Sequence, residues 1–334
     1  MHVPLALPDF FIDWQRMAEA IGPRTRLVII NTPHNPSGAL ISREELDRLA
    51  ALIRDRDIYL ISDEVYEHLV FDGVAHTSVL SHDELYPRSF VVSSFGKTYH
   101  VTGWKTGYVV APPALSAELR KVHQYVNFCG VTPLQWALAD YMAGHPEHLR
   151  QLPGFYQAKR DLFCDLLLDS RFRFTRAPGT YFQCVDYSAI RPDLDDVAMA
   201  EWLTREHGVA AIPVSVFYEK APDAMRLVRF CYAKREETLR QAAGKAMRDL
   251  TVLPDLDIAL VQSLPGLARR PGQPRAFRRP AGECRRRRSG GPPGDVHHGF
   301  QHGFGPSRPS PNWGRPMPGC WSRPGALARW SPAA

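Results

Sequence analysis

Short, almost continuous apolar segments alternate with helical patterns through the first 245 residues of the chain. Their length and their content of valine, isoleucine and leucine are typical of strands that are buried on both faces. Such strands occur in α/β proteins, where helices cover a parallel or mixed sheet. The sequence therefore predicts an α/β fold. Four segments are predicted to be strands of the main sheet: residues 26–31, 58–62, 89–94 and 106–111.

Polar residues follow three of these predicted strands. Asn35 comes after the loop that ends the first strand, Asp63 directly follows the second, and Lys97 lies just past the third. In open parallel sheets, ligands bind beyond the carboxyl ends of the strands. We therefore expect these three polar groups, which are distant in the sequence, to converge on one crevice.

The sequence after residue 140 predicts a second, smaller α+β unit. A long helical pattern is followed by a hairpin pattern, a shorter helix, two further strands and a final helix. We therefore predict a large domain over residues 1–140 and a small domain over residues 141–250. The segments of the small domain are 146–168 (helix), 172–174 with 181–185 (hairpin), 197–205 (helix), 209–213 and 225–232 (strands), and a helix from 236.

The C-terminal part of the chain has a different composition. Residues 264–334 contain 13 Pro and 12 Gly, and such a segment cannot bury enough apolar surface to fold. We expect residues 251–334 to be disordered or to be translated in a wrong reading frame; a natural basic tail is the alternative. Residues 246–334 hold 14 Arg and 5 acidic residues, a charge of +9, so residues 1–245 carry −3 of the total +6. The predicted domains therefore lack the basic surface of a nucleic-acid-binding protein.

Several other classes of protein are excluded by simple patterns. No stretch of 18 apolar residues predicts a membrane span, and the N-terminus does not have the pattern of a secretory signal. Four cysteines lie within the predicted domains at spacings that suit reduced thiols, which favours a cytoplasmic protein. The histidines and cysteines show no metal-ligand spacing, so no metal site is predicted.

Five short motifs occur in an order and spacing that together are highly specific. Asn35 and Asp63 are separated by 28 positions, and Asp63 and Lys97 by 34. With these motifs the chain resembles the fold-type I aminotransferases, which depend on pyridoxal 5′-phosphate (PLP), over residues 2–245. Within them it is most similar to the branch with methionine, glutamine and kynurenine aminotransferases. The motifs are NTPHNPSG at 31–38, SDEVY at 62–66, SSFGKT at 93–98, TGWKTGY at 102–108 and RFCY at 229–232.

The resemblance implies roles for the residues that would bind PLP. Lys97 matches the lysine that forms a Schiff base with the cofactor and then moves a proton at the substrate α-carbon. The alternative of a phosphate-binding P-loop is excluded because that motif needs glycine at the position of Val91. Asp63 matches the residue that keeps the pyridine nitrogen protonated, although a helix N-cap is an alternative. Tyr66 and Asn35 match the pair that hydrogen-bonds the phenolic oxygen.

Further positions match residues that bind phosphate and substrate. Ser94 and Lys105 match the phosphate ligands, where lysine acts as a point charge in place of the arginine of many relatives. Arg229 matches the arginine that binds the substrate α-carboxylate, with a structural ion pair as the alternative, and Asn35 is assigned to the substrate-binding residues as well. Phe128 matches an aromatic residue that reaches the partner subunit's substrate pocket, with ordinary core packing as the alternative.

The resemblance implies an enzyme that moves an amino group from an amino acid of the methionine, glutamine or aromatic type to a 2-oxo acid. Trp104, Phe128 and Tyr181 suit a large or apolar substrate side chain. It also implies a homodimer. The resemblance begins partway into the family pattern, so we expect an N-terminally truncated large domain. Alternatives are a PLP-dependent carbon–sulfur β-lyase, an inactive truncated fragment, and a ligand sensor without turnover.

Overall fold

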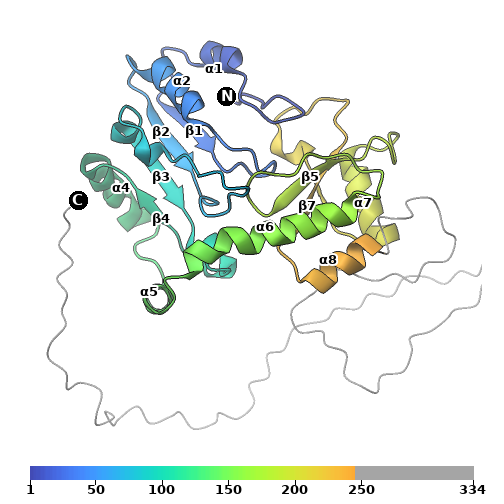
Figure 1. Ribbon diagram of the computed structural model, residues 1–334. Helices are drawn as coiled ribbons and strands as arrows, with labels where there is room; N and C mark the ends of the chain where they lie inside the picture. The colour runs from blue at the N-terminus through green and yellow to red at the C-terminus, as the bar shows by residue number, and fades with distance from the viewer. Residues whose placement is uncertain (245–334) are drawn as a thin grey trace, which may run out of the picture. The chain divides into compact units, whose positions relative to one another are not determined.

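The computed structural model describes residues 1–244 (Figure 1). The predicted segment 251–334 lies outside the described residues, as do the last residues of the predicted small domain. Two separate sheets make up the strand content of the described part. No helix within residues 1–244 combines the length and the apolar character that a membrane span requires.

The first sheet has four strands in the order β1-β2-β3-β4 (Figure 1). The first three are parallel to one another, whereas β4 is antiparallel to β3. The expected mixed sheet is therefore confirmed, and each predicted strand is found within two residues of its expected bounds. The strands are β1 (Leu27–Asn31), β2 (Tyr59–Asp63), β3 (Ser89–Ser93) and β4 (Tyr108–Val110).

One face of this sheet is covered by helix α2 (Arg43–Ile53). The helix begins with a capping box of Ser42 and Glu45. The buried leucines of the helix pack against the buried residues of β1. Along the strand these alternate with residues that are not buried. Ile29, for example, is 66% exposed. The expectation of a sheet covered on both faces is therefore wrong for the described residues, because they supply a helix layer on one face only.

The second sheet is antiparallel, with strand order β5-β7-β6. The predicted hairpin is wrong at its first arm, because residues 172–174 make only one isolated bridge, between Arg173 and Asp186. The strands are β5 (Phe182–Asp186), β6 (Ile212–Pro213) and β7 (Leu227–Cys231). The helices of this part are α6 (His148–Leu167), α7 (Asp196–His207) and α8 (Glu236–Ala242).

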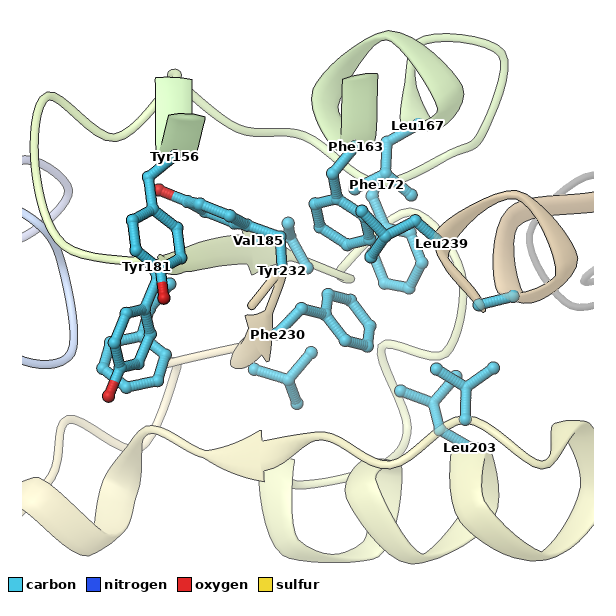
Figure 2. Close-up of a cluster of buried hydrophobic side chains, with 14 of the residues drawn as sticks. Tyr156, Phe163, Leu167, Phe172, Tyr181, Val185, Leu203, Phe230, Tyr232 and Leu239 are labelled. Atoms are coloured by element: carbon cyan, nitrogen blue, oxygen red, sulfur yellow. The ribbon is translucent and has the colours of Figure 1, made fainter. Parts of the chain in front are cut away.

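Aromatic side chains form the core between α6 and this sheet (Figure 2). The ring of Phe230 on β7 meets Phe163 of α6 and Phe172 edge-on, with centroids 5.8 and 5.7 Å apart. Such pairs add to the stabilisation from burial because ring edges and faces carry opposite partial charges. At the other side of the cluster Tyr156 and Tyr181 lie close together (Figure 2), with ring centroids 5.6 Å apart.

Several helices were not predicted from the sequence. The most informative is α4, in which no residue is buried, so its apolar residues do not mark an inward face. The division into domains at residues 140 and 250 stays a prediction. The additional elements are α1 (Trp14–Ala20), α3 (Phe95–Thr98), α4 (Pro113–Val126), α5 (Thr132–Gly144), and the 3₁₀ helices η1 (Val79–Ser81), η2 (Tyr86–Arg88), η3 (Thr102–Trp104) and η4 (Ser215–Phe217).

A close contact between two loops joins the motif at residues 31–38 to the approach to β5. Gly38 has φ +79°, and a Cβ atom there would lie 2.5 Å from the carbonyl oxygen of Gly179. Gly179 is in turn bridged to Val70, and the amide of Thr180 donates a hydrogen bond of 2.8 Å to the carbonyl of Leu69. Glycine at position 38 is therefore needed both for the backbone angle and for the close approach.

Candidate active site

The carboxyl ends of β1 and β2 bring the first two predicted site residues together. Asn31 pairs with Asp63 in the parallel register, and its side-chain amide donates to the Asp63 carbonyl at 2.8 Å. The Asn31 side-chain oxygen also accepts from the Asn35 backbone amide at 2.8 Å. Asn31 therefore links the Asn35 loop to the end of β2. The sequence analysis did not single out Asn31, although its place at a strand end was a usable signal.

Lys97 lies on α3, the short helix that follows β3. Its Nζ atom is 5.7 Å from the ring centroid of Tyr66 and 5.9 Å from that of Tyr181. These distances place the amine among aromatic rings, in a half-buried position. The structure thus places Lys97 close to Tyr66 and to Tyr181, which the sequence analysis named for the substrate side chain.

The carboxyl group of Asp63 has a raised pKa. Burial is the main cause; a hydrogen bond from the Val65 amide and the positive charge of Lys97 act in the opposite direction. The Val65 amide donates to Oδ1 at 3.2 Å, and Oδ2 accepts no hydrogen bond from residues 1–244. A half-buried carboxylate with one unoccupied oxygen suits a protonated ring nitrogen as its partner.

Tyr66 is almost fully buried, with 2% of its surface exposed. Its ring meets Tyr181 edge-on at 5.3 Å and Phe182 at 5.9 Å. Burial, and to a smaller extent Tyr181, raise the pKa of the Tyr66 hydroxyl well above its usual range. Tyr66 is therefore a neutral hydroxyl over the whole physiological pH range.

Arg229 on β7 meets Asn35 across 194 positions of sequence. One terminal nitrogen donates to the Asn35 side-chain oxygen at 2.7 Å, and the guanidinium lies 3.9 Å from the ring centroid of Phe182. The Nε atom is buried and has no hydrogen-bond partner within residues 1–244. A buried donor without a partner is costly, so this atom is suited to an anion. No acidic side chain within residues 1–244 forms an ion pair with Arg229, which argues against the structural ion pair.

Ser94 and Lys105 come from two segments that lie against each other. Ser94 is the N-cap of α3, but its side chain makes no capping hydrogen bond. A Cβ atom at Gly107 would lie 2.6 Å from the carbonyl oxygen of Ser93, so the loop with Lys105 passes closely over the β3–α3 junction. Lys105 itself is exposed and left-handed, with φ 56°. Both residues are available to an anion at this junction.

Phe128 is 81% exposed and follows the C-terminal end of α4. Its exposure rules out the alternative of ordinary core packing within the described residues. Within residues 1–244 no hydrogen bond or ring contact of its side chain joins Phe128 to the Lys97 group. Its predicted role in a partner's pocket stays a prediction. Within residues 1–244 no group of three metal-binding side chains occurs, and no metal was predicted.

His34 precedes Asn35, and its Nδ1 atom lies 2.8 Å from the Ser37 hydroxyl. Burial lowers the pKa of His34 from 6.5 to about 4. Between these pH values the His34 ring is neutral in the folded chain and protonated in the unfolded chain. The stability of the folded chain therefore falls as the pH falls through this range. The ring also lines a hollow of about 930 Å³, which gives water some access and reduces the effect.

We expect the free energy of unfolding to fall by about 2 kcal/mol through His34 between pH 7 and pH 4.5, since a tenfold change in proton affinity is worth about 1.4 kcal/mol. Urea unfolding at both pH values measures it. The His34→Gln variant keeps a polar partner for Ser37 and does not titrate, so it is expected to lose less stability on acidification than the wild type. An equal loss in both proteins contradicts the prediction.

The comparisons with known proteins agree with these motifs. The family model of aminotransferase class I and II matches residues 1–245. The chain belongs to the class I and II aminotransferases. This family is PLP-dependent in general. The Escherichia coli strain K12 methionine aminotransferase is 52% identical over 244 residues, which cover 73% of this chain and 63% of that protein. Kynurenine–oxoglutarate transaminase 3 of Rattus norvegicus is 38% identical over 251 residues, which cover 70% and 55%.

Solved aminotransferase structures share the fold. An Escherichia coli structure with a methionine aminotransferase function superposes with a TM-score of 0.70 at 52% identity, covering 73% of this chain and 63% of that one. The Mycobacterium tuberculosis N-succinyldiaminopimelate aminotransferase gives 0.67 at 36% identity, covering 72% and 63%. The present aminotransferase chain thus spans less than two thirds of the length of these relatives. The predicted fold class and family branch are confirmed.

The residues present fit PLP in three respects. Asp63 has an unoccupied carboxylate oxygen, Ser94 has a hydroxyl that makes no cap, and the Lys97 amine lies beside the Tyr66 ring. Phe182, which stacks on Arg229, is the other residue of this group that the sequence analysis did not identify; its signal was an aromatic pair at the start of a strand.

Proposed function

We propose that this protein is a PLP-dependent aminotransferase that moves an amino group from an amino acid to a 2-oxo acid, with Lys97 as the cofactor lysine. The observation that carries the proposal is the group formed by Lys97, Asp63 and Tyr66 beside the pair of Asn35 and Arg229. A lysine, a half-buried carboxylate, a phenol and an anion-binding arginine are the groups that this chemistry requires.

The proposed roles follow from the surroundings of each residue. Bound PLP supplies an electron sink for the substrate α-carbon. The Asp63 carboxylate holds a proton on the ring nitrogen, since burial and an unoccupied oxygen favour a charged partner. Tyr66 and Asn35 hydrogen-bond the phenolic oxygen, and Ser94 and Lys105 bind the phosphate, one by its hydroxyl and one by its charge.

Arg229 and Asn35 would bind the substrate. The buried Nε atom of Arg229 gains its missing partner when a carboxylate binds. Asn35 orients the guanidinium through its hydrogen bond of 2.7 Å and therefore belongs to both the cofactor and the substrate sets. The Lys97 amine, once free, moves the proton at the α-carbon.

We propose methionine, glutamine or an aromatic amino acid as the donor. The support is the 52% identity to a methionine aminotransferase and the match to kynurenine transaminases. The aromatic rings of Tyr181 and Phe182 beside Arg229 are consistent with a large or apolar side chain.

We also propose a homodimer and a cytoplasmic location. The surface of α4, α5 and the loop between them exposes large apolar side chains, and such surfaces mark protein contacts. Phe128 belongs to this surface, which supports its proposed role in a partner's pocket. The described cysteines have free thiols, which suits a reducing compartment. The exposed side chains are Val122, Tyr125, Val126, Phe128, Val131 and Trp136.

The proposal is tested by absorbance spectroscopy of the purified protein with PLP, before and after methionine is added. We expect a cofactor band that depends on the protein, its replacement by the band of the pyridoxamine form, and one equivalent of 2-oxo acid per bound cofactor. Adding a 2-oxo acid after the methionine is expected to restore the first band.

Two results would contradict the proposal. Repeated release of pyruvate and ammonia from a cysteine thioether, with no acceptor acid present, would identify a carbon–sulfur β-lyase. A folded protein that shows no cofactor band would identify a chain of this family without its activity.

A further inference from the structure

One carboxylate oxygen connects three segments of the candidate site. Oε1 of Glu67 accepts a hydrogen bond of 2.5 Å from the Ser93 hydroxyl and one of 2.6 Å from the Tyr108 hydroxyl. Glu67 follows Tyr66 on the turn after β2. Ser93 is the last residue of β3 and directly precedes Ser94, and Tyr108 is the first residue of β4.

The chemistry of these groups makes the connection strong. Hydroxyl groups that donate to an ionised carboxylate form short, charge-assisted bonds, and a carboxylate oxygen can accept two. Ser93 is 3% exposed, so its hydroxyl depends on a protein acceptor. Burial, with the hydrogen bond to Glu67 next in importance, raises the pKa of Tyr108 to about 12, so Tyr108 stays a donor at physiological pH.

Strand β4 needs such a connection because its pairing is short. It pairs with β3 at three positions only and is an edge strand of the sheet. The loop before it carries Lys105, and the close approach at Gly107 shows that this loop has little free space above Ser93. Any shift of Tyr108 therefore moves Lys105 relative to Ser94.

We propose that Glu67 is a positioning residue that holds the turn of Tyr66, the β3–α3 junction of Ser94 and Lys97, and the loop of Lys105 in one arrangement. Glu67 acts through Ser93 and Tyr108. Its effect is greatest on the phosphate side of the site, where two of the three segments meet. The inference rests on the proposed function for its link to PLP, but the connection between the segments exists without the cofactor.

The experiment measures the dissociation constant of PLP, by fluorescence titration, for the wild type and for Glu67→Ala and Glu67→Gln. We expect Glu67→Ala to weaken PLP binding about tenfold, because a hydrogen bond to a charged group is worth roughly one power of ten in affinity. Glutamine keeps an oxygen that accepts both hydroxyl groups, so Glu67→Gln is expected to stay within about threefold of the wild type.

A double-mutant cycle with Tyr108→Phe separates positioning from general stability. We expect Tyr108→Phe to weaken PLP binding, and its effect to be much smaller when Glu67 is already alanine. The matched control is Glu84→Ala, which removes a surface carboxylate with two hydrogen bonds to Arg54 at 2.7 and 3.0 Å. This control is expected to leave the dissociation constant unchanged.

Three outcomes overturn the inference: Glu67→Ala binds PLP as the wild type does, the cycle is additive, or Glu84→Ala weakens PLP binding equally. If Glu67→Ala does not fold, Tyr108→Phe and Ser93→Ala, which each delete one hydroxyl, take its place. If the wild type binds no PLP, the proposed function fails. Amide hydrogen exchange of the cofactor-free protein then tests whether Glu67 holds the segments together. Lower protection of residues 94–108 in Tyr108→Phe than in the wild type supports the inference, and equal protection overturns it.

Discussion

Replacing Lys97 with alanine is expected to lower the rate of amino transfer by at least about 10⁴-fold, because one side chain both holds the cofactor and moves the proton. Its amine lies in a half-buried position near the rings of Tyr66 and Tyr181. We expect that neither water nor a neighbouring side chain takes over the role of this amine. The measurement is the steady-state rate with methionine and a 2-oxo acid, together with the absorbance of bound PLP.

The matched control for this prediction is Lys220→Ala. Lys220 is an exposed lysine in the segment before β7, outside α4 and α5. Surface substitutions usually change stability by less than about 0.5 kcal/mol, so this variant is expected to fold and react as the wild type does. Retention of more than about one hundredth of the activity in Lys97→Ala would show that another group performs the proton transfer.

Replacing Arg160 with methionine is expected to lower the free energy of unfolding by about 2 kcal/mol, because the buried carbonyl of Ala177 loses its donor and two carboxylates lose charge-assisted hydrogen bonds. Arg160 lies on α6 and is 2% exposed. All five of its N–H groups donate: two to Asp72 oxygens at 2.6 and 2.7 Å, two to Asp161 Oδ1 at 2.8 and 2.9 Å, and one to the Ala177 carbonyl at 3.1 Å.

The position of Arg160 explains why the effect is large. Asp72 follows the segment that bridges to Gly179, so the guanidinium ties this loop to α6 and to the approach to β5. Urea unfolding measures the change. Arg176 is the matched control, since it pairs with Asp161 and Asp165 but is 40% exposed. Arg176→Met is expected to cost less than about 1 kcal/mol. An equal cost for both arginines would contradict the argument from burial.

The strands of the first sheet were predictable because each is a short apolar segment bounded by turn-forming residues. The helices α4 and α5 were not predictable in the same way. The apolar residues of α5 are spread around its axis and give no periodic signal, whereas α4 has a periodic pattern that the sequence analysis did not use. Large apolar side chains of both helices are exposed, as the 87% exposure of Tyr125 illustrates. The same exposure is what indicates a contact surface.

The residues of the candidate site that belong to local sequence motifs were predictable. Asn35, Asp63 and Lys97 each follow a strand, and parallel strands bring their carboxyl ends to one edge. Asn31 and Glu67 escaped prediction because their importance lies in their partners. A side-chain amide or a carboxylate acts as a connector only when the chain has placed particular donors and acceptors around it.

The sequence by itself determined the family, the order of the strands along the chain and the types of residue available for chemistry, because periodicity, turn residues and motif spacing are local properties. Only the tertiary structure decided that Arg229 meets Asn35 with its Nε atom unpaired, and that Glu67 receives two hydroxyl groups at one oxygen. These contacts join residues across strands and sheets. Their strength depends on burial and direction, which arise when the chain packs and are not encoded in any short segment.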